Sequence, residues 1–230
     1  GYGATEAMPV SAFGSDAILN ETRKLSEQGY GMCVGQPVAG IDVRIIRISD
    51  GPIAQWTDDL LLPDGEIGEI SVRGDQVTRG YYERPRDDAL AKIVDGDTFW
   101  HRMGDLGWID KKGRIWFCGR KSHRVVCSNK TMFTIPCEAI FNNHPRVYRS
   151  ALVGVGPQGR QRPVVCIELV PEDAGKDKKG LKKELLALAK SSPISEDIET
   201  ILFHRAFPVD IRHNSKIFRE QLAVWAENKR

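Results

Sequence analysis

The 230-residue sequence lacks the features that would place it in several specialised protein classes. It has no apolar run approaching the roughly 20 residues that a helix needs to cross a bilayer, so we expect no transmembrane segment. It also lacks an excess of one charge, because 33 Lys and Arg stand against 31 Asp and Glu. The net charge of +2 gives no reason to expect nucleic acid as a partner. The hydrophobic fraction of 41% is ordinary for a chain that buries a sizeable core.

Paired cysteines are absent as well. There are five cysteines, an odd number, and none forms a Cys-x-x-Cys pair. This pattern indicates free thiols in a reducing compartment, and we expect a cytoplasmic protein. A metal site built from Cys118, Cys127, His101 and His123 is a weaker alternative, because structural zinc sites use closely paired ligands.

The first half of the sequence indicates short strands separated by turns. Ile41–Ile48 alternates apolar and polar residues, which is typical of a half-buried strand. Frequent turns between such segments predict a small barrel or a distorted sheet. The other predicted strands are 67–72, 99–102, 106–109 and 114–118, with a turn at Gly104-Asp105 between 99–102 and 106–109.

The pattern changes near Gly119. Helical spacing and capping residues predict helices at 136–143, 181–190 and 217–228. Apolar runs predict strands at 151–155, 163–169 and 201–203, so the second half is a compact α+β domain. The lysine-rich stretch 176–183 is interpreted as a solvated loop and helix start, and a docking patch for an acidic or phosphate-bearing partner is the alternative.

Several residue groups carry possible chemistry, although each has a plain structural interpretation when taken alone. Tyr2, Gly3, Thr5 and Glu6 combine an aromatic ring, a flexible backbone, a hydroxyl and a carboxylate. Such a set is suited to stacking a base, binding a phosphate and holding Mg²⁺, which prefers hard oxygen ligands. The alternative is an ordinary turn.

Three further groups lie downstream. Asp105, at a predicted turn, is suited to accept hydrogen bonds from a ribose diol, or simply to cap its turn. The polar segment 119–124 is either a surface linker or a hinge. Lys216, on a predicted polar loop at 208–216, is either solvated or a mobile positive charge for an anionic reacting centre.

Taken together, these groups resemble the motifs of the adenylate-forming superfamily of acyl-CoA synthetases, peptide-synthetase adenylation domains and luciferases. Their order along the whole chain carries the resemblance. The matching elements are Tyr2–Glu6, Gly68-Glu69-Ile70 through Gly80-Tyr81 to Pro85, Gly104-Asp105, Gly119-Arg120, Asn143-His144-Pro145 with Val147, Val153-Gly154, and Lys216.

The resemblance implies a mixed α/β and α+β fold. Residues 1–118 would be the β-rich end of a large adenylation domain, and 119–230 a small mobile C-terminal domain with a hinge near 119–122. The missing front of the large domain would hold the phosphate-binding loop and most of the acyl pocket. We therefore expect this chain alone to be inactive, or at most a nucleotide-binding module.

The resemblance also assigns roles to individual residues. Tyr2 would lie against the adenine, Gly3 would belong to the same nucleotide-binding motif, Thr5 would bind a phosphate, and Glu6 would hold Mg²⁺. The ribose hydroxyls would be bound by Asp105 and Arg120. Lys216 would contact the attacking carboxylate and the α-phosphate of ATP.

More specific strings resemble the β-lactone synthetases of bacterial long-chain olefin biosynthesis. These strings are 1–7, 100–105, 118–125 and 212–219. The resemblance implies adenylation of a long-chain β-hydroxy fatty acid, ring closure to a β-lactone with release of AMP, and a pathway shared with other olefin-forming enzymes.

The alternative is a long-chain fatty-acyl-CoA ligase, which would use coenzyme A. Against it, Ser128–Thr131 lies where thiol-using members carry a glycine loop that lets the backbone approach a ligand closely. An intramolecular hydroxyl is already tethered to the activated carbonyl and needs no such passage.

Overall fold

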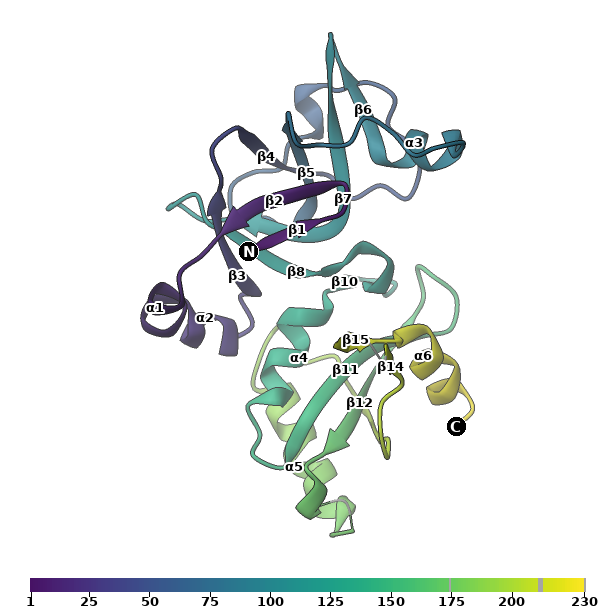
Figure 1. The fold of residues 1–230 in the computed structure, drawn as a ribbon. Helices are drawn as coiled ribbons and strands as arrows, with labels where there is room; N and C mark the ends of the chain where they lie inside the picture. The colour runs from purple at the N-terminus through teal and green to yellow at the C-terminus, as the bar shows by residue number, and fades with distance from the viewer. Residues whose placement is uncertain (174, 211–212, 230) are drawn as a thin grey trace. The chain divides into compact units, whose positions relative to one another are not determined.

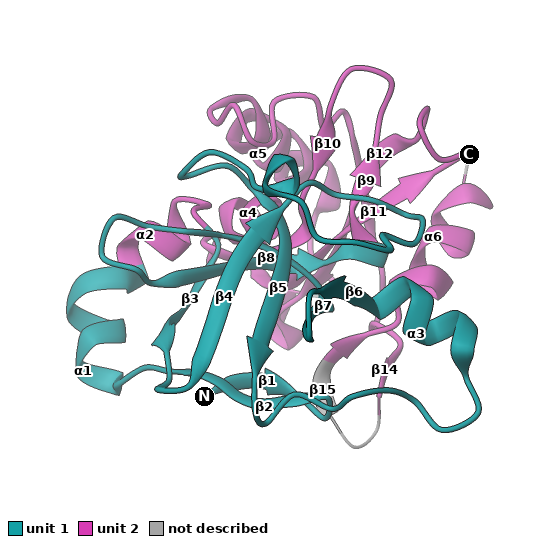
Figure 2. Cartoon of the chain, turned by 90° about the horizontal axis from the view of Figure 1, so that it is seen from above, with its two compact units in different colours: residues 1–23, 31–122 teal, residues 24–30, 123–230 magenta. Residues whose placement is uncertain are grey.

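The chain forms two units, each with its own hydrophobic core, in a computed structural model that describes residues 1–173, 175–210 and 213–229 (Figure 1). Unit 1 combines Gly1–Arg23 with Gly31–Ser122, and unit 2 combines Lys24–Tyr30 with His123–Arg230 (Figure 2). The boundary predicted after residue 118 lies inside a strand of unit 1, β8 (Ile115–Arg120). The functional division into 1–118 and 119–230 stays a prediction about the complete protein.

Unit 1 is built on one antiparallel sheet of eight strands. Seven of them run in the order β1-β2-β3-β8-β7-β5-β4, and β6 pairs with β7. Strand β4 is half-buried because apolar and polar residues alternate along it. Ile41, Val43 and Ile45 are buried, while Asp42 and Arg44 are exposed. The strands are β1 (Tyr2–Ala4), β2 (Ala7–Ala12), β3 (Met32–Pro37), β4 (Ile41–Ile46), β5 (Gly68–Gly74), β6 (Lys92–Asp95), β7 (Thr98–Ile109) and β8.

The prediction that a turn at Gly104-Asp105 separates two strands is wrong. Strand β7 continues for 12 residues through both positions, because it pairs with β5 on one side and β8 on the other. Gly104 fits this strand with a positive φ of 68°, a conformation that favours glycine. The register of both pairings shifts next to this position, so the local irregularity bends the strand without ending it.

The helices of unit 1 are short and carry no apolar stripe, which is why the sequence did not indicate them. Neither α1 nor α2 buries a side chain, and α3 begins with Pro85 at its first turn. The elements are α1 (Ser15–Ala17), the π-helix η1 (Ile18–Thr22), α2 (Arg23–Glu27), the 3₁₀ turns η2 (Asp58–Leu60) and η3 (Lys121–His123), and α3 (Pro85–Ala91). Both α2 and η3 straddle a boundary between the units.

Unit 2 places a three-stranded sheet between helices, as the apolar runs predicted. Strand β12 (Arg162–Leu169) pairs antiparallel with β11 (Val147–Val155) and parallel with β13 (Thr200–Phe203). Both faces are buried: Leu152 and Val165 pack with α4 (Thr134–Asn142) and α5 (Lys178–Lys190), whereas Val153 packs with α6 (Arg219–Glu227). Strands buried on two faces have continuous apolar sequences.

The smaller elements of unit 2 correct one prediction. The segment before the last helix is a hairpin of β14 (Val209–Asp210) and β15 (His213–Ile217), not a loop, and Ile217 belongs to β15 and not to the helix. Strand pairing between Val209 and Ile217 explains the difference. The remaining elements are β9 (Val125–Val126), β10 (Thr131–Met132) and the 3₁₀ turn η4 (Pro171–Asp173). Among the helices of the described residues, none has the length and apolar character to cross a membrane.

Candidate functional site

Thr5 and Glu6 form the turn that joins β1 to β2. Thr5 is exposed and Glu6 is half-buried. The hydroxyl of Tyr81 donates to Glu6 Oε1 at 3.0 Å, and the backbone N–H of Thr78 donates to the carbonyl of Glu6 at 2.8 Å. These bonds hold the carboxylate of Glu6 in one place at the end of the hairpin.

The surroundings of Glu6 favour its charged form. Partial burial works to raise its pKa, but hydrogen bonds from its own backbone N–H and from Tyr81 outweigh that effect. The positive charge of Lys92 and the nearby His101 act in the same direction, so the net pKa of Glu6 is lowered. An ionised carboxylate with a hydroxyl beside it is a hard oxygen donor set.

A second group joins three of the residues predicted to bind a nucleotide. The hydroxyl of Tyr2 donates to Asp105 Oδ2 at 2.7 Å, and Arg120 Nη1 lies 3.1 Å from Asp105 Oδ1. The pairing of β7 with β8 sets Asp105 opposite Arg120. Asp105 Oδ1 is buried against the Arg120 guanidinium and accepts no further hydrogen bond from the described residues.

Burial dominates the titration of this group. It raises the pKa of Asp105, while Arg120 and the Tyr2 hydroxyl work to lower it. Burial also raises the pKa of Tyr2 well above its ordinary value, and the negative charge of Asp105 adds to the effect. Tyr2 is therefore a hydrogen-bond donor at every ordinary pH. Its ring lies 6.1 Å from that of Phe117, centroid to centroid.

Gly3 has a steric reason for being glycine. A Cβ added at this position would lie 2.7 Å from the carbonyl oxygen of Ala7 in the facing strand β2. The close approach of β1 and β2 thus needs glycine whether or not a nucleotide binds here.

A cavity of about 460 Å³ in unit 1 brings part of the predicted site together. Glu6 and Tyr81 line it, as does Gly104, the neighbour of Asp105 in the chain. The lining combines acidic and basic side chains, which suits a ligand with both anionic and hydroxyl groups. The full lining is Glu6, Asp50, Tyr81, Arg84, Asp87, Leu90, Ala91, Arg102, Gly104 and Lys121.

Sequence reasoning missed a buried ion pair in the wall of this cavity. Arg102 Nε lies 2.7 Å from Glu69 Oε2, and Arg102 Nη2 donates to Glu69 Oε1 at 2.8 Å. Their side chains are 2% and 0% exposed, and Lys121 Nζ lies 3.2 Å from the same Oε1. Both residues stand in matched strings, Gly68-Glu69-Ile70 and Trp100–Asp105. A paired Glu and Arg inside otherwise apolar strands was the available signal.

Lys216 belongs to unit 2, whereas the other predicted site residues belong to unit 1. It is exposed on β15, so its ammonium group is accessible to solvent. The predicted hinge, 119–122, spans the end of β8 and the first residues of η3, and the division between the units falls after Ser122.

Ser128–Thr131 forms the tip of the hairpin of β9 and β10. The N–H of Cys127 donates to the carbonyl of Lys130 at 2.9 Å, and Lys130 Nζ lies 2.5 Å from Asp197 Oδ2. The tip therefore carries side chains, whereas a glycine loop would let a ligand approach the backbone closely.

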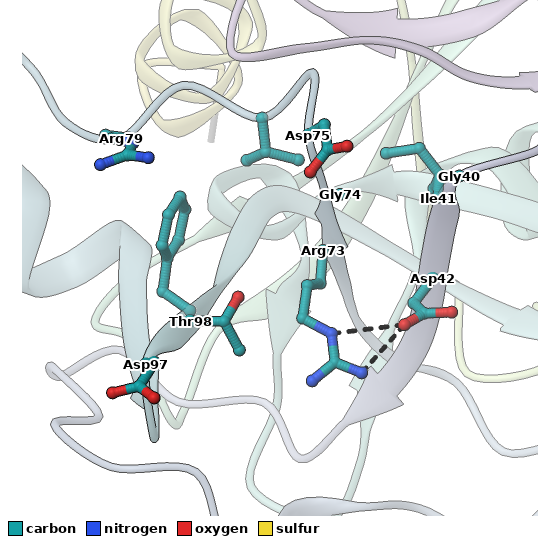
Figure 3. A pocket seen from close by; sticks show the side chains of 11 residues that line it. Gly40, Ile41, Asp42, Arg73, Gly74, Asp75, Arg79, Asp97 and Thr98 are labelled. Atoms are coloured by element: carbon teal, nitrogen blue, oxygen red, sulfur yellow. Dashed lines mark hydrogen bonds and ion pairs between the residues drawn. The ribbon is translucent and has the colours of Figure 1, made fainter.

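Another cavity of unit 1, of about 650 Å³, is lined by none of the predicted site residues. Figure 3 shows Arg73 of β5 beside Asp42 of β4, with Arg79 and Asp97 on the far side of the space. Arg73 is already engaged by Asp42 at 2.9 Å and by Asp95 at 2.9 Å, so it is not available to an anion. The smaller cavity is lined by one predicted site residue, Glu6, together with Tyr81 and Gly104 of the matched motifs.

The donor chemistry of the β1–β2 turn fits Mg²⁺. This ion keeps several waters and is held by one or two carboxylates together with substrate phosphates. The described residues contain no group of three or more His, Cys, Asp or Glu arranged to hold a metal by themselves. The ionised carboxylate of Glu6 suits a metal that arrives with a nucleotide.

Comparison with known proteins agrees with this chemistry. The sequence model of AMP-binding enzymes matches residues 1–82. An olefin β-lactone synthetase of Xanthomonas campestris pv. campestris is 47% identical over 234 residues, which cover 100% of this chain and 42% of that protein. The olefin β-lactone synthetase of Stenotrophomonas maltophilia is 46% identical, over 98% of this chain and 41% of its own length. The chain thus spans less than half of these relatives.

Solved structures show the same fold. The o-succinylbenzoate CoA synthetase MenE of Bacillus subtilis, in complex with its acyl-adenylate intermediate, superposes with a TM-score of 0.69 at 21% identity. The match covers 96% of this chain and 40% of that structure. The mixed, sheet-rich fold predicted from the sequence is confirmed.

Proposed function

The chain belongs to the AMP-binding enzymes, and we propose that it is part of an ATP-dependent ligase that activates a carboxylate as an acyl-adenylate. One observation carries the proposal: 47% identity to an olefin β-lactone synthetase extends over the whole chain. The predicted nucleotide-binding residues add support, because Tyr2, Asp105 and Arg120 lie together in unit 1.

In the first step, a carboxylate oxygen of the substrate attacks the α-phosphorus of ATP, and pyrophosphate leaves. Both reactants are anionic, so the site must supply positive charge and alignment. We assign the charge to Lys216. Glu6 would hold a magnesium ion, which would supply further positive charge to the phosphate oxygens, and Thr5 is assigned to a phosphate. Asp105 and Arg120 are assigned to the ribose, Tyr2 to the adenine, and Gly3 to the same nucleotide-binding segment.

In the second step, the proposed substrate is a long-chain β-hydroxy fatty acid. Its β-hydroxyl oxygen attacks the activated carbonyl carbon, the hydroxyl proton passes to a base or to solvent, and AMP leaves as the four-membered ring closes. The nucleophile is tethered to the electrophile, so no second substrate is required. The side chains at the tip of the β9–β10 hairpin are consistent with an enzyme that admits no pantetheine arm.

The test uses the complete protein that contains this chain. It is incubated with ATP, Mg²⁺ and a long-chain β-hydroxy acid, with and without coenzyme A, and the products are identified by mass spectrometry. A β-lactone and AMP formed without coenzyme A are the expected result. A product that forms only with coenzyme A, as a thioester, would instead identify a fatty-acyl-CoA ligase.

A further inference from the structure

Glu138 is a buried carboxylate that none of the matched motifs explains. It lies on α4, its side chain is 6% exposed, and it faces Arg219 at the first position of α6. Arg219 Nη2 donates to both carboxylate oxygens, at 2.8 Å and 2.7 Å, and Nε donates to Oε1 at 3.2 Å. This fork geometry fixes direction as well as distance.

Glu138 also holds the sheet. Its Oε1 accepts the backbone N–H of Leu152 at 2.8 Å, and its own carbonyl accepts the hydroxyl of Ser150 at 3.1 Å. One side chain therefore joins α4, the central part of β11 and the beginning of α6. The start of α6 is thereby tied to both α4 and the sheet of unit 2.

The start of α6 is also the end of the strand that carries Lys216. Arg219 follows Lys216 by three positions, and the two residues between them are held too. Ile217 is buried in the core beneath α6, and the N–H of Phe218 donates to the carbonyl of Pro208 at 2.9 Å. A displacement of Arg219 would therefore move the backbone of β15 and the origin of the Lys216 side chain.

We propose that Glu138 is a positioning residue for Lys216, acting through its bidentate ion pair with Arg219 at the junction of β15 and α6. The proposal rests on the proposed function, in which Lys216 acts in adenylation. A gain in folding stability does not by itself explain the ion pair of Glu138 and Arg219. A buried ion pair adds little net stability compared with apolar side chains of the same volume, but it fixes a unique geometry. The apolar core under α6 already supplies burial through Leu222 and Ala226.

The test is a mutant cycle in the complete protein. Glu138→Gln keeps the shape of the side chain and an oxygen for the Leu152 N–H, while it removes the charge that holds Arg219. Single-turnover adenylation is expected to slow at least about 10-fold, because small misplacements of a catalytic group are costly. Conversion of preformed acyl-adenylate to product is expected to stay within about 2-fold, since Lys216 is assigned to the first step only.

The same substitution is then made in the Lys216→Ala background. If Glu138 acts through Lys216, the second change adds less than about 2-fold to the loss, because there is no ammonium left to position. A full multiplicative loss in this background, or equal slowing of both half-reactions, would overturn the proposal. Arg219→Lys keeps the positive charge but loses the bidentate geometry of the guanidinium. It should slow adenylation by a smaller factor and leave the second half-reaction unchanged. This variant replaces Glu138→Gln as the test if Glu138→Gln does not fold.

The neighbouring Glu220→Gln is the matched control. The Glu220 side chain is 71% exposed and lies 3.3 Å from His123 Nε2. This variant should leave adenylation unchanged. Failure of the two proposals is distinguishable. An inactive wild-type protein overturns the proposed function, whereas an active wild type with a fully active Glu138→Gln variant overturns only the role of Glu138.

Discussion

The hydroxyl of Tyr2 donates a 2.7 Å hydrogen bond to Asp105 Oδ2, which joins two residues that are 103 positions apart in the sequence. Strand order makes the contact possible, because β1 and β7 belong to the same sheet. The bond fixes Asp105 from one side while Arg120 faces the other oxygen. One carboxylate oxygen is therefore oriented by Tyr2, and the other by Arg120.

This arrangement predicts how nucleotide affinity depends on pH. Only the ionised form of Asp105 accepts from both ribose hydroxyls, and burial raises its pKa above the ordinary 3.8. Affinity should therefore begin to fall at a higher pH than it would for an exposed aspartate. Tyr2→Phe removes a donor that stabilises the carboxylate, so the midpoint should move further up. Calorimetric titration of ATP into the complete protein across mildly acidic pH measures this. A midpoint that moves down in Tyr2→Phe would contradict the prediction.

The same residue predicts a stability effect of opposite sign. A raised pKa means that folded Asp105 holds its proton more tightly than the unfolded chain does. Its contribution to stability is therefore complete below the unfolded pKa and is lost as pH rises through the folded pKa. Asp105→Asn should abolish this part of the pH dependence in thermal unfolding curves, and an unchanged curve would argue against it.

The buried pair of Glu69 and Arg102 predicts a large cost when one partner is removed. Arg102→Met should lower the free energy of unfolding by about 3 kcal/mol, because the buried charge of Glu69 is left with Lys121 as its one cationic partner given by the described contacts. Arg47→Met is the control: Arg47 and Asp59 form an exposed pair, with 56% and 71% exposed side chains, and its loss should cost less than about 1 kcal/mol. Urea denaturation of the 230-residue chain compares the two. Equal losses would show that burial of the first pair is unimportant.

Lys216→Ala in the complete protein should leave the fold intact, because the side chain is exposed on β15. The rate of ATP–pyrophosphate exchange should fall at least about 100-fold, as expected when a charge that stabilises a transition state is removed. Lys183→Ala, an exposed lysine on α5, should change nothing. An unchanged exchange rate in Lys216→Ala would remove this residue from the mechanism.

Glu6→Gln should weaken the metal site and leave the hairpin in place. The concentration of Mg²⁺ needed for half-maximal adenylation should rise about 10-fold, since a charged ligand is lost. Binding of Mn²⁺ in the presence of ATP, followed by electron paramagnetic resonance, gives a readout independent of turnover. Glu66→Gln, an exposed glutamate in the turn before β5, is the control. Equal Mn²⁺ affinity in wild type and Glu6→Gln would place the metal elsewhere.

Local patterns predicted the parts of the fold that depend on local physics. The apolar runs of β11 and β12 and the leucines of α5 indicated their elements, because periodicity follows directly from which faces are buried. The secondary-structure prediction failed where pairing with a distant strand determines the local conformation. Gly104 and Asp105 read as a turn, but pairing on both sides keeps β7 continuous. The residues before Lys216 read as a loop, but β14 supplies a strand partner for β15.

The sequence by itself determined the chemical inventory and its order: an aromatic, a hydroxyl and a carboxylate at Tyr2–Glu6, an aspartate at 105, a lysine at 216. These follow from residue types and spacing, which need no contacts. Only the tertiary structure decided that Tyr2 orients Asp105, that Arg102 neutralises Glu69, and that Arg219 binds Glu138. Such pairs join residues 33 to 103 positions apart. Strand order and helix packing set which distant side chains meet, and that information is not carried by any local stretch of sequence.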